Sequence, residues 1–241
     1  MKASPEIRTY RAALEFRAAS RGGSIGTLAG YAAKFNKLSR NLGGFVEQIA
    51  PTAFNKSLAD GVRVMARYNH KDAALLGTTD AGTLRLNVDE VGLLYEIDLP
   101  DTTAGRDVAA LAARGDVRFS SFAFHVHPDG DEWGYTEQDF PMRTLRSAQL
   151  VDIAPVNDPA YLDTSSGLRS LAEARGLDLA VVTDHAARND LRVLLKKDLD
   201  GEQTVATDQT PPPQTPTADP DAIRSALDVA RRRLELLRVP R

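Results

Sequence analysis

A serine, a histidine and an aspartate in this sequence could together perform nucleophilic catalysis. His70 follows the alternating apolar run at 62–68, Ser121 lies in FSSFAF, and Asp152 lies in the apolar segment LVDIAPV. In such a set the histidine takes the serine proton, and the carboxylate holds the imidazole and stabilises its charged form. Each residue alone also fits a structural role, and their spacing in the sequence does not by itself show that the three side chains meet.

Two adjacent serines compete for the role of nucleophile. The segment 117–127 alternates as a β-strand, so neighbouring side chains point to opposite faces. Ser120 shares a face with Phe122, which predicts that it points into the core. Ser121 points away, beside the small Ala123, and we expect room there for a substrate to approach the hydroxyl.

A metal site is the competing chemistry. The turn PDGDEWG lacks the length and the twelfth-position glutamate of a calcium-binding EF-hand loop. We therefore expect no metal and no cofactor. The groups that could bind a metal are His70 with Asp72, or His125 and His127 with Asp129 and Asp131.

Composition narrows the function classes. The 241 residues include no cysteine, which excludes a cysteine nucleophile, disulfides and thiolate metal sites. A formal charge of -3 argues against a strongly basic nucleic-acid-binding protein. No segment reaches the roughly 18 apolar residues that span a bilayer, and the N-terminus does not resemble a secretory signal. We expect a cytoplasmic protein that binds neither nucleic acid nor membrane.

The elements that must position these residues are mostly short strands. Strands are predicted at 82–88 and 92–99, which form a hairpin, at 117–127 and within 143–156. Helices are predicted at 51–60 and at 102–116, the second with Thr102 or Thr103 as N-cap and Gly115 as its end. This pattern predicts an α+β domain built round a curved sheet or a small barrel.

Four blocks of the sequence form a recognisable pattern. The first opens with GYAAKFNKLS and continues through FVEQIAPTAF, and the second begins YNHKDAALLGTT. The third is RGDVRFSSFAF, and the fourth is LVDIAPVNDPAY. The blocks occupy residues 30–58, 68–100, 114–124 and 150–165. Together and in this order, they resemble the HK97-type caudoviral prohead serine proteases.

The resemblance implies a role for each candidate residue. His70 falls on the family's base, Ser121 on its nucleophile and Asp152 on its acidic residue. The family is similar in fold to the herpesvirus assemblins, which implies a mainly antiparallel β-barrel core with surrounding helices. Because assemblins use a second histidine, His125 or His127 is the alternative to Asp152. Backbone amides near the turn at Arg114–Gly115 are the expected oxyanion donors.

The resemblance also implies substrates and a place of action. Such an enzyme is an endopeptidase that cleaves the scaffold, the delta segment of the major capsid protein and itself, inside the assembling prohead in the host cytoplasm. The oligomeric state stays open, with a homodimer as one option. The alternative function is a non-catalytic capsid assembly protein with a degenerate protease fold.

The chain is expected to divide into five parts. Residues 207–220 are rich in proline and threonine and predict a linker. Residues 221–241 predict an amphipathic helix with a net charge of about +3, which either docks on a partner or packs on its own domain. The other expected parts are an N-terminal arm (1–24), the protease domain (25–170) and a helical, polar extension (171–206).

Overall fold

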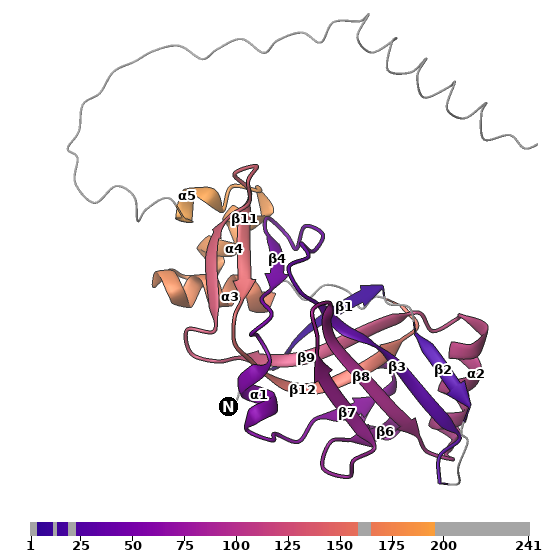
Figure 1. The fold of residues 1–241 in the computed structure, drawn as a ribbon. Helices are drawn as coiled ribbons and strands as arrows, with labels where there is room; N and C mark the ends of the chain where they lie inside the picture. Colours follow the sequence, from indigo (N-terminus) through magenta and orange to yellow (C-terminus); the bar gives the residue numbers. More distant parts are fainter. Residues whose placement is uncertain (1–3, 12–13, 19–22, 159–164, 196–241) are drawn as a thin grey trace, which may run out of the picture. The chain divides into compact units, whose positions relative to one another are not determined.

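The computed structural model describes residues 4–11, 14–18, 23–158 and 165–195. The described strands form three sheets (Figure 1). In spatial order, the five-stranded sheet contains β1 (Glu6–Arg11), β9 (Phe119–Val126), β12 (Ala148–Val156), β5 (Met65–Arg67) and β6 (Leu75–Thr78). The four-stranded sheet contains β2 (Glu15–Ala18), β3 (Gly26–Lys34), β8 (Gly92–Leu99) and β7 (Leu84–Val88), and the three-stranded sheet contains β10 (Asp131–Tyr135), β11 (Pro141–Leu145) and β4 (Val46–Ile49).

None of these sheets closes on itself, so the predicted β-barrel is wrong. The mixed α and β class and the predominance of strands are confirmed. The hydrogen-bonded ladder ends at β6 on one sheet and at β7 on the other, although the two strands follow one another in the chain. The four-stranded and five-stranded sheets therefore remain separate sheets, which pack against one another.

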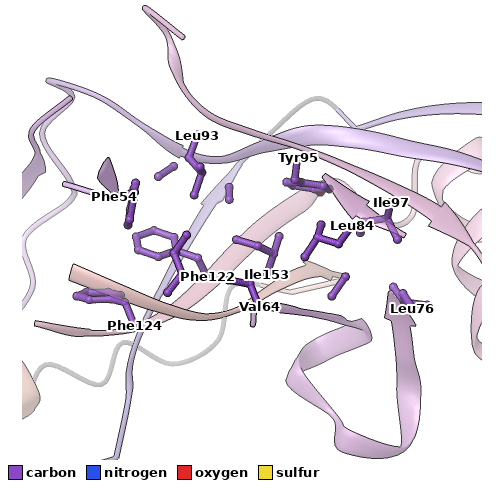
Figure 2. Packing of buried hydrophobic residues seen from close by; sticks show 14 of the residues in the cluster. Phe54, Val64, Leu76, Leu84, Leu93, Tyr95, Ile97, Phe122, Phe124 and Ile153 are labelled. Atoms are coloured by element: carbon purple, nitrogen blue, oxygen red, sulfur yellow. The ribbon is translucent and has the colours of Figure 1, made fainter. Parts of the chain in front are cut away.

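The main hydrophobic core lies between these two sheets (Figure 2). Phe122 and Phe124 of β9 are fully buried there, opposite Leu93 and Tyr95 of β8. The Phe122 ring also meets Phe54 edge to face, with ring centroids 5.4 Å apart. The phenylalanine face of β9 is thus the core face, as the alternation predicts.

Helix ends follow the local sequence where capping residues are present. Helix α2 (Thr103–Arg114) begins after Thr102, whose hydroxyl accepts a hydrogen bond from the Gly105 amide at 3.2 Å. It ends at Gly115, which has the left-handed conformation that glycine adopts without steric cost. Helix α1 (Asn55–Ala59) is shorter than predicted because residues 51–54 form turns instead.

The remaining helices pack beside the three-stranded sheet and form a second apolar cluster. Phe45 is fully buried in it, and the partly buried Trp133 packs against Phe45 with ring centroids 4.9 Å apart. No helix among the described residues is long and apolar enough to cross a membrane. The helices are α3 (Ser165–Arg175), α4 (Leu179–Ala187) and α5 (Arg192–Leu195), and the short 3-10 turns are η1 (Tyr68–His70) and η2 (Asp72–Ala74).

A buried network of charges fixes strand β1 to the three-stranded sheet. The fully buried Arg143 binds Glu6 at 2.7 Å, Glu47 at 3.0 Å and Asp131 at 2.6 Å. Arg8 of β1 binds the same two glutamates, at 2.8 and 2.7 Å. Because each buried charge has an opposite partner, the network is tolerated in the interior and fixes the position of β1.

The predicted parts of the chain relate to these elements in different ways. Strands β1 and β2 come from residues 1–24, and the boundary expected at 170 falls within α3. The segment 143–156 contains parts of two strands, β11 and β12, separated by Arg146 and Ser147. The predicted linker at 207–220 and the predicted basic helix at 221–241 lie outside the described residues.

Candidate active site

The side chains of Ser121, His70 and Asp152 form one continuous chain of hydrogen bonds. The His70 Nε2 atom lies 2.7 Å from Ser121 Oγ, and its Nδ1 atom lies 2.7 Å from Asp152 Oδ1. Ser121 belongs to β9 and Asp152 to the neighbouring β12, where Asp152 pairs with Ala123. His70 is 51 positions from Ser121 and 82 from Asp152 in the sequence, and the folding of one sheet brings the three together.

His70 reaches this position through an unusual turn after β5. Asn69 and His70 have φ angles of 53° and 57°, in the left-handed region that costs a non-glycine residue roughly 1–2 kcal/mol. The Asn69 side chain accepts a hydrogen bond from the Asn157 amide at 3.2 Å, which ties the turn to the end of β12. The local strain is thus held by the surrounding sheet, and it aims the imidazole across the strands.

The contacts fix which ring nitrogen donates. A carboxylate can only accept, so His70 Nδ1–H donates to Asp152 Oδ1. In a neutral ring Nε2 then accepts, and the Ser121 hydroxyl donates to it. Ser121 Oγ also lies 3.0 Å from the Arg8 carbonyl oxygen and accepts from Thr9 Oγ1 at 3.1 Å. Its single hydrogen can point to His70 or to Arg8, but not to both.

The site is more enclosed than the sequence predicts. Ser121 and Asp152 each have 0% of their surface exposed, and the His70 side chain has 14%. The expected room beside Ala123 is absent because β1 runs next to β9, with Thr9 directly opposite Ser121. A peptide can reach Oγ only after the residues around it move.

Arg67 is a site residue that sequence reasoning missed. Its Nε donates to Asp152 Oδ2 at 2.7 Å, and a second guanidinium nitrogen contacts the same oxygen. Its third nitrogen contacts Asp72. Asp152 therefore binds His70 with one oxygen and Arg67 with the other. The only signal for Arg67 in the sequence is its position: it is a polar residue in an alternating strand, three residues before His70.

Ser120 lies on the opposite face of β9, as the alternation predicts. Its hydroxyl is fully buried and lies 2.8 Å from the Tyr95 hydroxyl in the main core. Burial raises the pKa of Tyr95, and the hydrogen bond to Ser120 opposes that shift. No contact joins Ser120 to His70, so the two serines have separate surroundings.

The other candidate groups do not come together with His70. His127 Nδ1 contacts Ser147 Oγ at 2.9 Å, while His125 lines a separate cavity. Asp131 is engaged by Arg143. Within the described part of the chain, no three acidic or histidine side chains are grouped as metal ligands would be.

One backbone amide at the turn expected to supply oxyanion donors is already hydrogen-bonded. The Gly115 amide donates to the Ala112 carbonyl at 3.0 Å to close helix α2. This amide is therefore already used and is not available to a developing oxyanion.

Comparisons with known proteins identify the family of this chain. The profile of the family described as caudovirus prohead serine protease matches residues 12–176, which include all three members of the hydrogen-bonded chain. No curated protein matches. Among solved structures, the bacteriophage T4 capsid assembly protease gp21 is similar at 8% identity and a TM-score of 0.41, over 64% of this chain and 99% of that one. Because the profile covers more than half of the sequence, this chain belongs to the caudovirus prohead serine protease family.

Proposed function

We propose that this protein is a prohead maturation endopeptidase in which Ser121 is the nucleophile, His70 the general base and Asp152 the residue that orients the base. The observation that supports this most strongly is the unbroken series of contacts from Ser121 Oγ through the His70 ring to Asp152. The distance of 2.7 Å between His70 Nε2 and Ser121 Oγ is within the range in which a base can take a hydroxyl proton, and the contact to Asp152, also 2.7 Å, orients the ring.

The first step is attack of Ser121 Oγ on the carbonyl carbon of a peptide bond, while Nε2 of His70 takes the hydroxyl proton. The ring becomes positively charged, and the carboxylate of Asp152 stabilises that charge without taking the proton. His70 then gives the proton to the leaving amine as the carbon–nitrogen bond breaks. Water repeats the sequence on the acyl-enzyme and restores Ser121.

Arg67 is proposed as a positioning residue for Asp152. Since both contacting nitrogens of the guanidinium bind Oδ2, the remaining oxygen stays directed at His70 Nδ1. Arg67 also supplies the opposite charge that a fully buried carboxylate requires. It touches neither Ser121 nor the reacting bond, so its effect passes through Asp152.

The proposed substrates are the scaffold, the delta segment of the major capsid protein and the protease itself, inside the assembling prohead. Family membership supports this choice. An extended, unfolded segment is the form of peptide most able to enter an enclosed site, because its backbone is accessible before binding. The oligomeric state stays open, with a homodimer as one option.

Co-expression with the major capsid protein of the same phage tests the proposal. The parent chain should shorten the capsid protein, and Ser121→Ala should abolish shortening while Ser120→Ala retains it. Equal shortening by the parent and Ser121→Ala would exclude Ser121 as nucleophile. Capsid assembly without any shortening by the parent would favour the non-catalytic assembly role instead.

A further inference from the structure

A cavity of about 380 Å³ lies on the five-stranded sheet, away from the hydrogen-bonded chain of Ser121, His70 and Asp152. Its volume is at the lower end of those that bind whole small molecules, which leaves ample room for a large side chain. Its wall comes from the segment before β5 and from β5, β9 and β12, the strands that also position the candidate catalytic residues. The lining residues are Val62, Arg63, Met65, His125, Gln149, Leu150 and Val151.

The strand register places this cavity on the same face as the catalytic residues. Paired residues of neighbouring strands point to the same side of a sheet. Met65 pairs with Asp152, so the cavity starts directly beside the carboxylate. His125 pairs with Gln149 and lies four residues along β9 from Ser121, an even number that keeps both on one face.

The register also gives the separation between the cavity and the nucleophile. Four residues of a strand span roughly 13 Å. An extended substrate peptide advances by nearly the same length per residue, and its alternate side chains point to the same side. A side chain about four residues from the scissile bond therefore lies over the cavity when the peptide follows the sheet.

The residues that line the cavity favour one kind of substrate side chain. Met65 and Val151 contribute apolar surface, and Leu150, which also lines the cavity, is fully buried. Arg63 also lines the cavity, but its side chain is exposed to solvent and its guanidinium lies 3.1 Å from Asp80. An uncharged aliphatic side chain fits this surface better than a carboxylate or an ammonium, which would lose hydration there.

We propose that this cavity is a substrate-binding subsite that takes an aliphatic side chain about four residues from the scissile bond. This rests on the proposed function, and it assigns to His125 a place in substrate binding rather than in the triad. An aliphatic side chain at that position should raise kcat/KM by roughly ten-fold or more over alanine, as one or two buried methylenes do in other enzymes.

The test uses the full chain and pairs of peptides that differ only in leucine or alanine, at each of the four positions on either side of the cleaved bond. In the parent, leucine should be preferred over alanine at one position, about four residues from the bond. Val151→Phe, which places a larger side chain at the cavity wall and narrows it, should reduce that preference to within about two-fold and leave the other positions unchanged. Val91→Phe, at an exposed residue of the β7–β8 turn, is the matched control and should cleave like the parent.

The outcomes separate this inference from the proposed function. Cleavage of the leucine and alanine peptides by Val151→Phe in the parent's ratio would overturn the subsite. A preference for aspartate or lysine over leucine at that position would overturn the aliphatic assignment. If Ser121→Ala cleaves every peptide as the parent does, the proposed function fails, whatever the cavity binds.

Discussion

Arg67 binds Asp152 through the carboxylate oxygen that His70 leaves unused, with its Nε 2.7 Å from Oδ2. Arg67→Met should therefore lower kcat by roughly 10-fold to 100-fold with little change in KM, because the carboxylate loses the contact that directs it at His70. Arg67→Lys should restore part of the loss, since it returns the charge without the planar fork.

Steady-state kinetics on one peptide substrate measures this effect. Arg106→Met, at an exposed arginine of α2, is the control and should match the parent. A rise in KM with kcat unchanged, or an Arg67→Lys variant no better than Arg67→Met, would mean that Arg67 does not act through Asp152.

Ser120→Ala should separate stability from catalysis. The change leaves the buried Tyr95 hydroxyl without its partner at 2.8 Å, which should lower the free energy of unfolding by about 1 kcal/mol. Peptide cleavage should stay within about two-fold of the parent, because Ser120 points into the core. Urea unfolding and kinetics on the same preparation measure both quantities. Loss of cleavage with unchanged stability would identify Ser120 as the active serine.

Because β1 covers Ser121, the rate at which Ser121 reacts with a covalent reagent should depend on the size of the reagent. Ser121 is fully buried, and Thr9 Oγ1 lies 3.1 Å from its hydroxyl. A small serine-directed phosphonate should therefore label the protein much faster than a bulky one. Thr9→Ala should bring the two rates closer together by opening space at Oγ. Labelling followed by intact-mass spectrometry gives both rates, and an unchanged ratio would show that Thr9 does not limit access.

The buried charges around β1 should make the fold sensitive to acid. Burial raises the pKa of Glu6, but hydrogen bonds and charges from Arg143 and Arg8 outweigh it and hold the pKa below its usual value of 4.5. The unfolded chain then binds more protons than the folded one, so the stability contributed by Glu6 is complete above about pH 4.5 and is lost as the pH falls through the folded pKa. Glu47 and Asp131 complete the network and also face Arg143.

Glu6→Gln should remove this contribution. At pH 7 it should lower the free energy of unfolding by about 3 kcal/mol, because it leaves buried arginines with too few partners. Between pH 5 and pH 3 its stability should fall less steeply than that of the parent. Urea unfolding at several pH values measures the slopes, with the exposed Glu90→Gln as control. Equal slopes for Glu6→Gln and the parent would contradict the account.

Local rules predicted the parts of the site that depend on local sequence. Alternation along β9 is sufficient to place Ser120 and Ser121 on opposite faces, and the Thr102 and Gly115 caps define α2. Arg67 was missed because its partner is 85 residues away and meets it only through the pairing of β5 with β12. The burial of Ser121 was missed for a similar reason, since Thr9 covers it from a strand 112 residues away. The barrel was wrong because closure depends on whether edge strands such as β6 and β7 pair.

The central claim is that Ser121 is a nucleophile activated by His70, and covalent labelling tests it most directly. The protein is treated with a small fluorophosphonate, digested and mapped by mass spectrometry. The account predicts one adduct, on Ser121, that is reduced at least 100-fold in His70→Ala and unaffected in Ser120→Ala. An adduct on Ser120, or equal labelling of Ser121 in the parent and His70→Ala, would contradict it.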